Sequence, residues 1–468
     1  MEASSNQPDL ISALSDSILI HILSFLPSNL SGQTSILSRR WRHLWEYVPE
    51  LIFHDFTDER IFSFLTHRKS SNLRRFHVTS SSRDLLDHAD KYTIDQALHF
   101  CSTQGVEELN LLFDTNSSRS YNMYLLRAKT LSCWGATLRV LNLHCCLVRC
   151  PIKINLPKVE ELYLSRVSME RGAFNHIITG CPSVEIFEIA RCSVSLLRFH
   201  LPILKRLVLD RCFLEHINIS VPNLKFFKHK GRVESLKTFL MRVDNLKEAK
   251  YCMYDNWDRN SEGYVRGYQH IFEAVAQAEH LQVNCGGIRL DRLLRIFNKN
   301  LACGNVKCLV LKNADLKFLA VVPAIIRLLP GLENLDLSLQ TIPPDTPEYE
   351  RFYYLKSNMS ELEKKLSMHL NNTKRSIYCL SYSLRRIDVR HFEARNTQIE
   401  LLKLLVQNAS VLEVICFTDS YGSIARLLKS REILTSHAAS KNIKFMDQKN
   451  LNRHVALEME DDYDSDYE

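Results

Sequence analysis

A short apolar pattern recurs along the chain and constrains its fold more than any other feature. In each copy, apolar residues stand at the first, fourth and sixth positions. Six copies lie in the first half of the sequence: Leu73-Phe76-Val78, Val106-Leu109-Leu111, Leu138-Leu141-Leu143, Val159-Leu162-Leu164, Val184-Phe187-Ile189 and Leu204-Leu207-Leu209. Repetition this regular indicates a chain built from stacked units rather than around a single core.

The spacing of the copies indicates which kind of stack they form. The last four copies start 21, 25 and 20 residues apart, within the period of leucine-rich repeats. Each unit would supply one short strand with inward-pointing apolar side chains, then a turn and a helical or irregular return. We predict a solenoid over residues 70–340, with a polar loop at residues 255–267. Further copies follow, two degraded and two clean: Leu224-Phe227-His229, Leu246-Ala249-Tyr251, Val306-Leu309-Leu311 and Leu332-Leu335-Leu337.

The chain after residue 340 divides into two segments. Residues 341–374 hold three closely spaced prolines, which oppose regular helix or central strand, and we expect an insertion loop and helix there. Residues 375–447 resume the repeat pattern and should close the end of the solenoid. We expect a strand at Leu384-Ile387-Val389, an amphipathic helix over residues 399–408 that buries Leu401, Leu402, Leu405 and Val406, and a strand at Leu412-Ile415-Phe417.

The first 50 residues have a helical pattern instead. Ser15 can cap a helix in which apolar residues recur up to Leu26, and Pro27 should end it. A second short helix should follow Ser28 or Asn29, and Ser38 can cap a third. A segment this short cannot bury all its apolar side chains by itself, so the surplus indicates a partner. The alternative is that it forms the first layer of a larger core.

Three stretches at this end resemble a known family. Residues 9–14, residues 22–27 and residues 34–45 look like the F-box of the plant F-box/FBD/leucine-rich-repeat family. The body sequences at residues 156–164 and 180–187 are similar to the repeats of that family, and residues 379–389 with 399–413 resemble its FBD region. The resemblance implies an α/β fold: a small three-helix F-box at residues 9–50, then the leucine-rich-repeat solenoid and an FBD-like region.

The family also implies a function. Its F-box docks on a Skp-type adaptor, which links it to a cullin-based ubiquitin ligase. The resemblance thus implies adaptor binding by nine residues: Leu14, Ile18, Ile22, Leu23, Leu26, Pro27, Leu37, Trp41 and Trp45. This chain departs from the family pattern at Leu10, Ser15 and the pair Gly32-Gln33. We expect Gly32 to cost the helix roughly 0.5 to 1 kcal/mol and to remove a side chain from the docking surface.

Composition limits the remaining possibilities. The net charge of +7 includes seven acidic residues and no basic residue in residues 458–468, so the rest of the chain carries +14. Its lysines and arginines are scattered without a nucleic-acid motif, and we do not expect nucleic-acid binding. We expect the acidic segment to be a disordered, solvated tail. No export signal or apolar run of spanning length is present, so we expect no membrane association and a cytoplasmic or nuclear protein, with its 14 cysteines reduced and packed.

No constellation for catalysis or cofactor binding is evident. The sequence lacks the common nucleophile, metalloprotease, P-loop and dinucleotide motifs. The densest group of possible metal ligands is His144, Cys145, Cys146 and Cys150, whose spacing does not fit a zinc module; we interpret it as packed cysteines at a repeat turn. We interpret His270 and His280 as flanking a helix over residues 271–278. We therefore expect no catalytic residue, cofactor or metal.

Three hypotheses follow. The first is a non-catalytic substrate receptor of a ubiquitin ligase, which binds the adaptor through the F-box and an unknown target protein through the repeats. The second is a protein-interaction scaffold with weakened adaptor binding. The third, a hydrolase or transferase with a dispersed site, finds no support in the residues.

Overall fold

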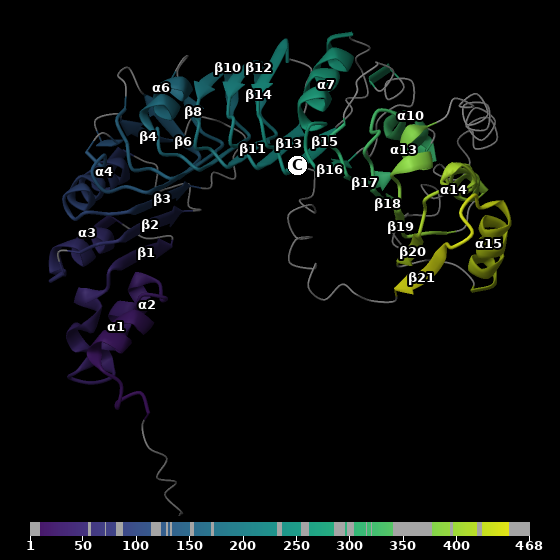
Figure 1. Cartoon of the computed structure of the whole chain (residues 1–468). Helices are drawn as coiled ribbons and strands as arrows, with labels where there is room; N and C mark the ends of the chain where they lie inside the picture. Colours follow the sequence, from purple (N-terminus) through teal and green to yellow (C-terminus); the bar gives the residue numbers. More distant parts are fainter. Residues whose placement is uncertain are drawn as a thin grey trace, which may run out of the picture. The chain divides into compact units, whose positions relative to one another are not determined.

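The chain forms two compact units, residues Met1–Asn223 and Leu224–Glu468, each built on parallel strands. Figure 1 shows the computed structural model with its helices and strands labelled. It describes residues 10–54, 58–70, 72–80, 88–113, 123–127, 130–131, 133–149, 154–169, 173–231, 236–253, 262–284, 295–296, 304–314, 316–319, 321–339, 377–393, 396–418 and 424–448. The predicted insertion at residues 341–374 and the acidic tail at residues 458–468 lie outside these residues.

The first unit begins with short helices and continues as a ladder of parallel strands. The helices are α1 (Asp16–Leu23), α2 (Ser28–Gln33) and the 3-10 segments η1 (Thr34–Ile36) and η2 (Trp41–Tyr47). The strands are β1 (Glu50–His54), β2 (Arg75–Ser80), β3 (Glu108–Phe113), β5 (Val140–His144), β7 (Glu161–Ser165), β9 (Ile186–Ala190) and β11 (Arg206–Asp210).

The apolar pattern sets the register of this ladder. Side chains alternate along a strand, so the fourth and sixth positions of each copy point to the same side. Equivalent positions pair across neighbouring strands, and every member is buried: Leu51, Phe76, Leu109, Leu141, Leu162, Phe187 and Leu207. The predicted repeat strands are confirmed. β1 was not predicted, although Val48, Leu51 and Phe53 carry the same spacing.

The second unit continues the plan. Its strands are β13 (Phe226–Gly231), β15 (Glu248–Met253), β16 (His280–Asn284), β17 (Cys308–Ala314), β18 (Asn334–Leu339), β19 (Arg386–Arg390), β20 (Val414–Thr418) and β21 (Lys444–Gln448), each parallel to the next. The strands predicted within residues 375–447 are confirmed as β19 and β20. α14 (Asn396–Asn408) buries the four predicted residues Leu401, Leu402, Leu405 and Val406.

The chain returns from strand to strand by two kinds of element. In the first unit these are α3 (Asp58–His67), α4 (His88–Thr103) and α6 (Ala173–Gly180), with short parallel strands β4 (Tyr124–Arg127), β6 (Cys146–Arg149), β8 (Ser168–Met169), β10 (Ser193–His200) and β12 (Phe213–Ser220). The prediction of helical or irregular returns is therefore wrong for these strands. Val194, Leu197 and Phe199 of β10 repeat the apolar spacing. Their side chains are buried, so these return strands cover the core from the side opposite the main ladder.

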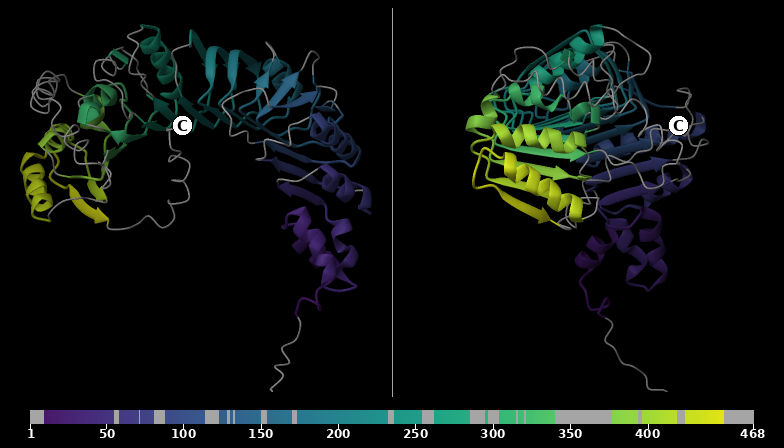
Figure 2. Two further views of the ribbon diagram at one scale, coloured as in Figure 1. Left: turned by 180° about the vertical axis from the view of Figure 1, so that it is seen from behind. Right: turned by 90° about the vertical axis from the view of Figure 1, so that its right-hand side faces the viewer.

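In the second unit the return elements are mainly helical. They are β14 (Thr238–Arg242), α7 (Glu262–Val275), α9 (Leu316–Leu319), α10 (Val322–Arg327), α13 (Tyr378–Tyr382), α14 and α15 (Ile424–His437). Figure 2 shows α14 and α15 lying side by side along the strands of this unit.

Two predictions around α7 are wrong. Residues 262–267 belong to α7 rather than to a polar loop, and residues 255–261 lie in the part of the chain that is not described. Neither histidine flanks the helix, since His270 lies within α7 and His280 begins β16. Ala278, Leu281 and Val283 carry the repeat spacing, so this strand is a further copy that the apolar residues of the helix obscured.

A left-handed residue near the end of a strand recurs along both units. In the first unit its amide donates to the last carbonyl of the following strand, as from Arg166 to Ala190 (2.8 Å) and from Arg191 to Asp210 (2.7 Å). Residues other than glycine rarely adopt this backbone conformation. We therefore attribute it to the stacking of the repeats, which fixes the path of the chain at each turn. The non-glycine residues with this conformation have φ between 48° and 57°: Cys145, Arg166, Arg191, Arg211, Asn313 and His391.

We predict that Arg191→Val destabilises the protein more than an equally exposed change in a strand. A β-branched side chain at a φ of 52° should cost about 1 to 3 kcal/mol, whereas Arg191→Asn should be close to neutral because asparagine tolerates this region. Urea unfolding followed by circular dichroism would measure both. The matched control is Arg198→Val in β10, and equal effects of the two valine variants would contradict the prediction.

Candidate functional site

The candidate site is the helical segment of residues 10–48, whose local structure follows from its sequence. Ser15 caps α1, as predicted, and its Oγ accepts a hydrogen bond from the Ile18 amide (3.4 Å). The helix ends at Leu23 rather than at Pro27, because the Ser24 hydroxyl donates to the carbonyl of His21 (2.7 Å) and a turn follows. Pro27 instead stands directly before α2.

The third part of this segment differs from the prediction. It is a 3-10 helix that starts at Trp41, and Ser38 does not cap it. Arg40 fixes it to the first helix instead. Its guanidinium donates to the carboxylate of Asp16 (2.7 Å), to the Ser12 carbonyl (2.7 Å) and to the Leu14 carbonyl.

These elements enclose a small core of their own. It consists of Leu19, Leu23, Leu44 and Val48, with Leu14, Ile20, Leu26 and Trp41 packed against it. Leu23 is one of the nine predicted site residues, but its side chain is only 1% exposed. It therefore belongs to the core of this segment and not to its surface. Five others are half-buried: Leu14, Leu26, Pro27, Trp41 and Trp45.

Many apolar side chains remain on the outside. Residues 10–47 hold nine of the eighteen exposed large hydrophobic side chains among the described residues, with Ile36 at 86% and Phe25 at 73% exposure. Concentrated exposed apolar surface marks an interaction site more often than scattered single residues do. The nine are Leu10, Ile11, Ile18, Ile22, Phe25, Leu30, Ile36, Leu37 and Tyr47. We call them the exposed apolar set.

The sequence identified three members of the exposed apolar set, Ile18, Ile22 and Leu37. The other six were not predicted. The prediction selected residues on or near the apolar stripe of a helix, whereas these six lie outside that stripe. In α1 the split is visible: Leu19 and Leu23 point to the core, while Ile18 and Ile22 lie one position earlier and remain exposed. Apolar residues outside α1, such as Phe25 in the turn and Ile36 in η1, were the available signal.

An aromatic contact joins this segment to the first repeat. The ring of Trp45 packs edge-on against Phe64 of α3, with centroids 4.9 Å apart, and Phe64 also contacts Phe53 of β1. A Cβ on Gly32 would lie 2.9 Å from Cζ of Phe64. Gly32 therefore faces Phe64 rather than a docking surface, and the expectation that it removes a side chain from that surface is wrong.

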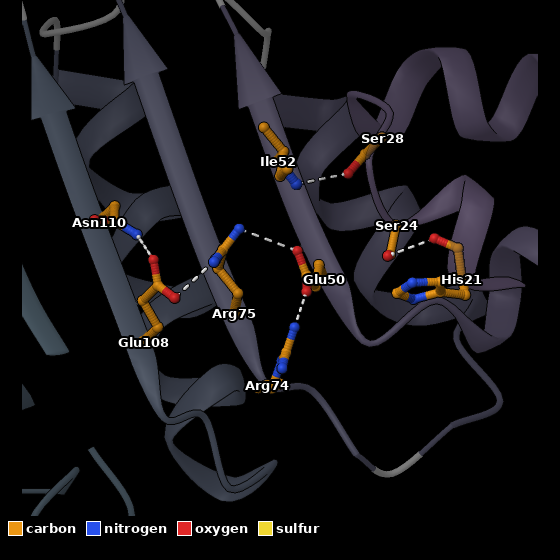
Figure 3. Close-up of polar contacts among 9 residues, drawn as sticks. All are labelled: His21, Ser24, Ser28, Glu50, Ile52, Arg74, Arg75, Glu108 and Asn110. Carbon is orange, nitrogen blue, oxygen red and sulfur yellow. Dashed lines mark hydrogen bonds and ion pairs between the residues drawn. The ribbon is translucent and has the colours of Figure 1, made fainter. Parts of the chain in front are cut away.

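Polar contacts strengthen the same junction (Figure 3). The Ile52 amide of β1 donates to Ser28 Oγ of α2 (2.9 Å). The buried carboxylate of Glu50 pairs with Arg74 and with Arg75 (3.2 Å), and Arg75 also reaches Glu108 of β3 (2.8 Å). A buried carboxylate is stable only when such partners replace its water.

A second buried carboxylate lies nearer the helices. Glu46 of η2 pairs with Lys69 (2.6 Å) and with His43 (2.7 Å). Burial alone would raise the pKa of the Glu46 carboxyl, but the hydrogen bonds from Lys69 and His43 outweigh it and hold that pKa below its usual range. Lys69 lies beyond α3, so this pair ties the helical segment to the chain that leads into β2.

The described part of the chain contains no group of three or more histidine, cysteine or acidic side chains that could hold a metal ion. Cys145 and Cys146 are buried at the turn between β5 and β6, as the interpretation of packed cysteines at a repeat turn predicted. Cys145 takes the left-handed position after β5, and the buried Cys146 thiol donates to the His144 carbonyl (3.4 Å), as Cys192 does to Ala190 (3.2 Å). Cys150 is outside the described residues.

Comparison with known proteins gives two family matches. The F-box domain matches residues 11–53, and the LRR repeats of the FBD-associated F-box protein At5g56370 match residues 94–244. Among curated proteins of Arabidopsis thaliana, the putative F-box/LRR-repeat protein At5g02930 is 28% identical over 73% of this chain and 74% of its own length. The F-box/FBD/LRR-repeat protein At4g26340 is 30% identical over 62% of this chain and 70% of its own length.

The chain belongs to the F-box/FBD/LRR-repeat family. Proteins of this kind are typically receptors rather than enzymes. Among solved structures, the one titled "Crystal structure of TLR13-ssRNA13 complex" aligns with 87% of this chain and 63% of its own, at 13% identity and a TM-score of 0.31, too low to support an argument. No helix among the described residues is long and apolar enough to cross a bilayer.

The F-box core gives one prediction. Leu23→Ala removes a side chain from a closed core and should destabilise the F-box by about 2 to 5 kcal/mol. Ile22→Ala, its exposed neighbour, should cost less than about 1 kcal/mol. Thermal unfolding of the two variants would compare them, and an equal loss would show that Leu23 is not a core residue.

The Glu46 pair gives a second prediction, on pH. A carboxyl whose folded pKa is lowered stabilises the fold above its unfolded pKa of about 4.3, and this contribution is lost as pH falls through the lower folded value. Glu46→Gln should therefore lose less stability than the unsubstituted chain between about pH 5 and pH 3.

Urea unfolding at several pH values would measure this difference. Glu160→Gln is the matched control, since Glu160 forms an exposed ion pair with Arg139 (2.8 Å). A pH profile of Glu46→Gln that parallels both the unsubstituted chain and this control would contradict the prediction.

Proposed function

We propose that this protein is the substrate-recognition subunit of an SCF-type ubiquitin ligase. Its F-box would bind a Skp-type adaptor, and through it a cullin, while the repeats bind a target protein. The observation that carries the proposal is the exposed apolar set, nine large side chains left uncovered on a segment that already has a closed core. Family membership supports the same role.

The residues of the docking surface can be stated more narrowly than the sequence allowed. We propose that Ile18, Ile22, Phe25, Leu30, Ile36 and Leu37 make the main apolar contacts, because their side chains are exposed. Leu14, Leu26, Pro27 and Trp41 would contribute their remaining exposed edges. Leu23 supports the surface from within, and Trp45 supports it through its contact with Phe64.

The alternative of a scaffold with weakened adaptor binding relied on the departures at Ser15 and Gly32. Ser15 caps α1, so it strengthens the helix that carries Ile18 and Ile22. Gly32 makes room for Phe64 at the junction with the first repeat. No described contact gives either residue a means of weakening the docking surface.

The role in ubiquitin transfer would be one of placement. Tethering a target near a conjugating enzyme raises its effective concentration and requires no catalytic residue in this chain. The proposal places the protein in the cytoplasm, the nucleus or both. Cell fractionation would test the location.

The docking surface gives a binding prediction. The double variant Ile22→Asp with Leu37→Asp should raise the Kd for a purified Skp-type adaptor by about 30-fold or more, because charges on a central apolar contact cost roughly 2 kcal/mol. Both residues are exposed, so the circular dichroism spectrum should be unchanged. Isothermal titration calorimetry would measure the Kd.

The matched control is Leu196→Asp in β10, since Leu196 is exposed to about the same extent as Ile22 (43% and 41%). A double variant that binds as well as the control would overturn the proposed docking surface. Mass spectrometry of proteins captured under proteasome inhibition would extend the test. Adaptor and cullin should be captured by the control but not by the double variant, whereas target proteins should be captured by both.

A further inference from the structure

Three lysines lie close together on two paired strands of the second unit. Lys228 of β13 lies directly opposite Lys250 of β15 in the strand register, and Lys230 follows two residues later on the same face. The buried residues Phe227 and Ala249 point to the other face, so the half-buried Lys228 and Lys250 lie on the outward side of the strands, and Lys230 beside them is largely buried. We call Lys228, Lys230 and Lys250 the lysine face.

The lysine face differs from other basic positions on the strand ladders. Arg206 pairs with Glu188 (2.7 Å), Arg386 with Asp388 (2.8 Å) and Arg390 with Asp336 (2.7 Å). These pairs neutralise the arginines within the fold.

Within the described chain, neither Lys228 nor Lys230 has such a partner. Lys250 has only a 3.4 Å contact with Glu248 and lies 5.6 Å from the centre of the Phe226 ring. Like charges directly opposite in a sheet repel each other, and Lys230 is only 7% exposed. The arrangement favours a bound anion.

The same chain contains an acidic segment of matching character. Residues 458–468 carry seven carboxylates and no basic residue. We propose that this acidic segment binds the lysine face of its own chain. The proposal goes beyond the proposed function and does not depend on it.

The length of chain between the two is sufficient. β21 ends at Gln448, so ten residues lead to the first acidic residue, Glu458, and they span at most about 33 to 36 Å. In the strand order of this unit, β21 is seven positions from β13 and six from β15, or roughly 29 to 34 Å along the sheet. The later acidic residues reach further.

The intramolecular arrangement also favours this occupant over a free acidic molecule. A tether raises the effective concentration of the segment, most for the acidic residues beyond Glu458, whose longer tether need not be fully extended. Several weak ion pairs, each worth less than about 1 kcal/mol when exposed, would then suffice to keep it bound at low salt.

Cross-linking of the full chain tests the contact directly. A carbodiimide joins carboxylates to amines only when they touch, and peptide mass spectrometry identifies the pair. We expect cross-links from residues 458–468 to Lys228 and Lys250, within one chain. Cross-links spread equally over exposed lysines such as Lys158, Lys307 and Lys441 would overturn the proposal, as would links found only between differently isotope-labelled copies.

A second measurement uses matched variants. A fluorophore attached after Glu468 should show high anisotropy at low salt and lose it in about 1 M NaCl, where charges are screened within about 3 Å. The variant Lys228→Gln, Lys230→Gln, Lys250→Gln should already have the high-salt value at low salt. The control Lys158→Gln, Lys307→Gln, Lys441→Gln removes the same charge and should not.

Changing the seven carboxylates of the acidic segment to amides should reproduce the lysine-face result, and it leaves all strand residues intact. Equal anisotropy in the two lysine variants would overturn the proposal. A high anisotropy that survives neutralisation of the acidic segment would do so as well.

Discussion

In-register stacking of parallel strands is the constraint on which the rest of the structure depends. One repeat has a single strand and a strip of apolar side chains, and it can bury neither alone. In the first unit the strip becomes continuous because Leu109 pairs with Leu141, Leu141 with Leu162, and Leu162 with Phe187. Each turn must then bring the chain back at one register. This requires a residue with a left-handed backbone conformation after a strand, which is unfavourable for a residue other than glycine, such as Arg191.

This constraint explains which parts of the fold could be predicted from the sequence. The period-two alternation of a strand makes the apolar spacing visible, and the predicted repeat strands were therefore confirmed. The same spacing occurs at Val48-Leu51-Phe53 and Ala278-Leu281-Val283, where neighbouring helical patterns concealed β1 and β16. It also occurs in return strands such as β10, so the spacing identifies a strand but does not tell which side of the core it covers.

The candidate site was less predictable because exposure depends on tertiary contacts. α1 has more apolar residues than one face can hold, and only the packing of Leu44 and Val48 decides that Leu19 and Leu23 are inside while Ile18 and Ile22 are outside. Gly32 shows the same limit. Helix propensity predicts only an energetic cost for this glycine, whereas the space that it leaves is filled by Phe64, which lies 32 positions away in the sequence. A local sequence pattern cannot show that two residues so far apart in the chain are in contact.

The junction between F-box and repeats bears on how a receptor of this kind would work. A flexible link would let a bound target sample many positions, and effective concentration falls as the accessible volume grows. Here the link is short and well anchored: Ser28 holds β1, Phe64 fills the space beside Gly32 and Trp45, and Glu46 and Glu50 are buried with basic partners from the chain that leads into β2. Buried ion pairs contribute less to stability than apolar packing, but they tolerate few alternative geometries. Charges at this position therefore favour one orientation of the exposed apolar set relative to the first repeats, which is what placement of a target requires.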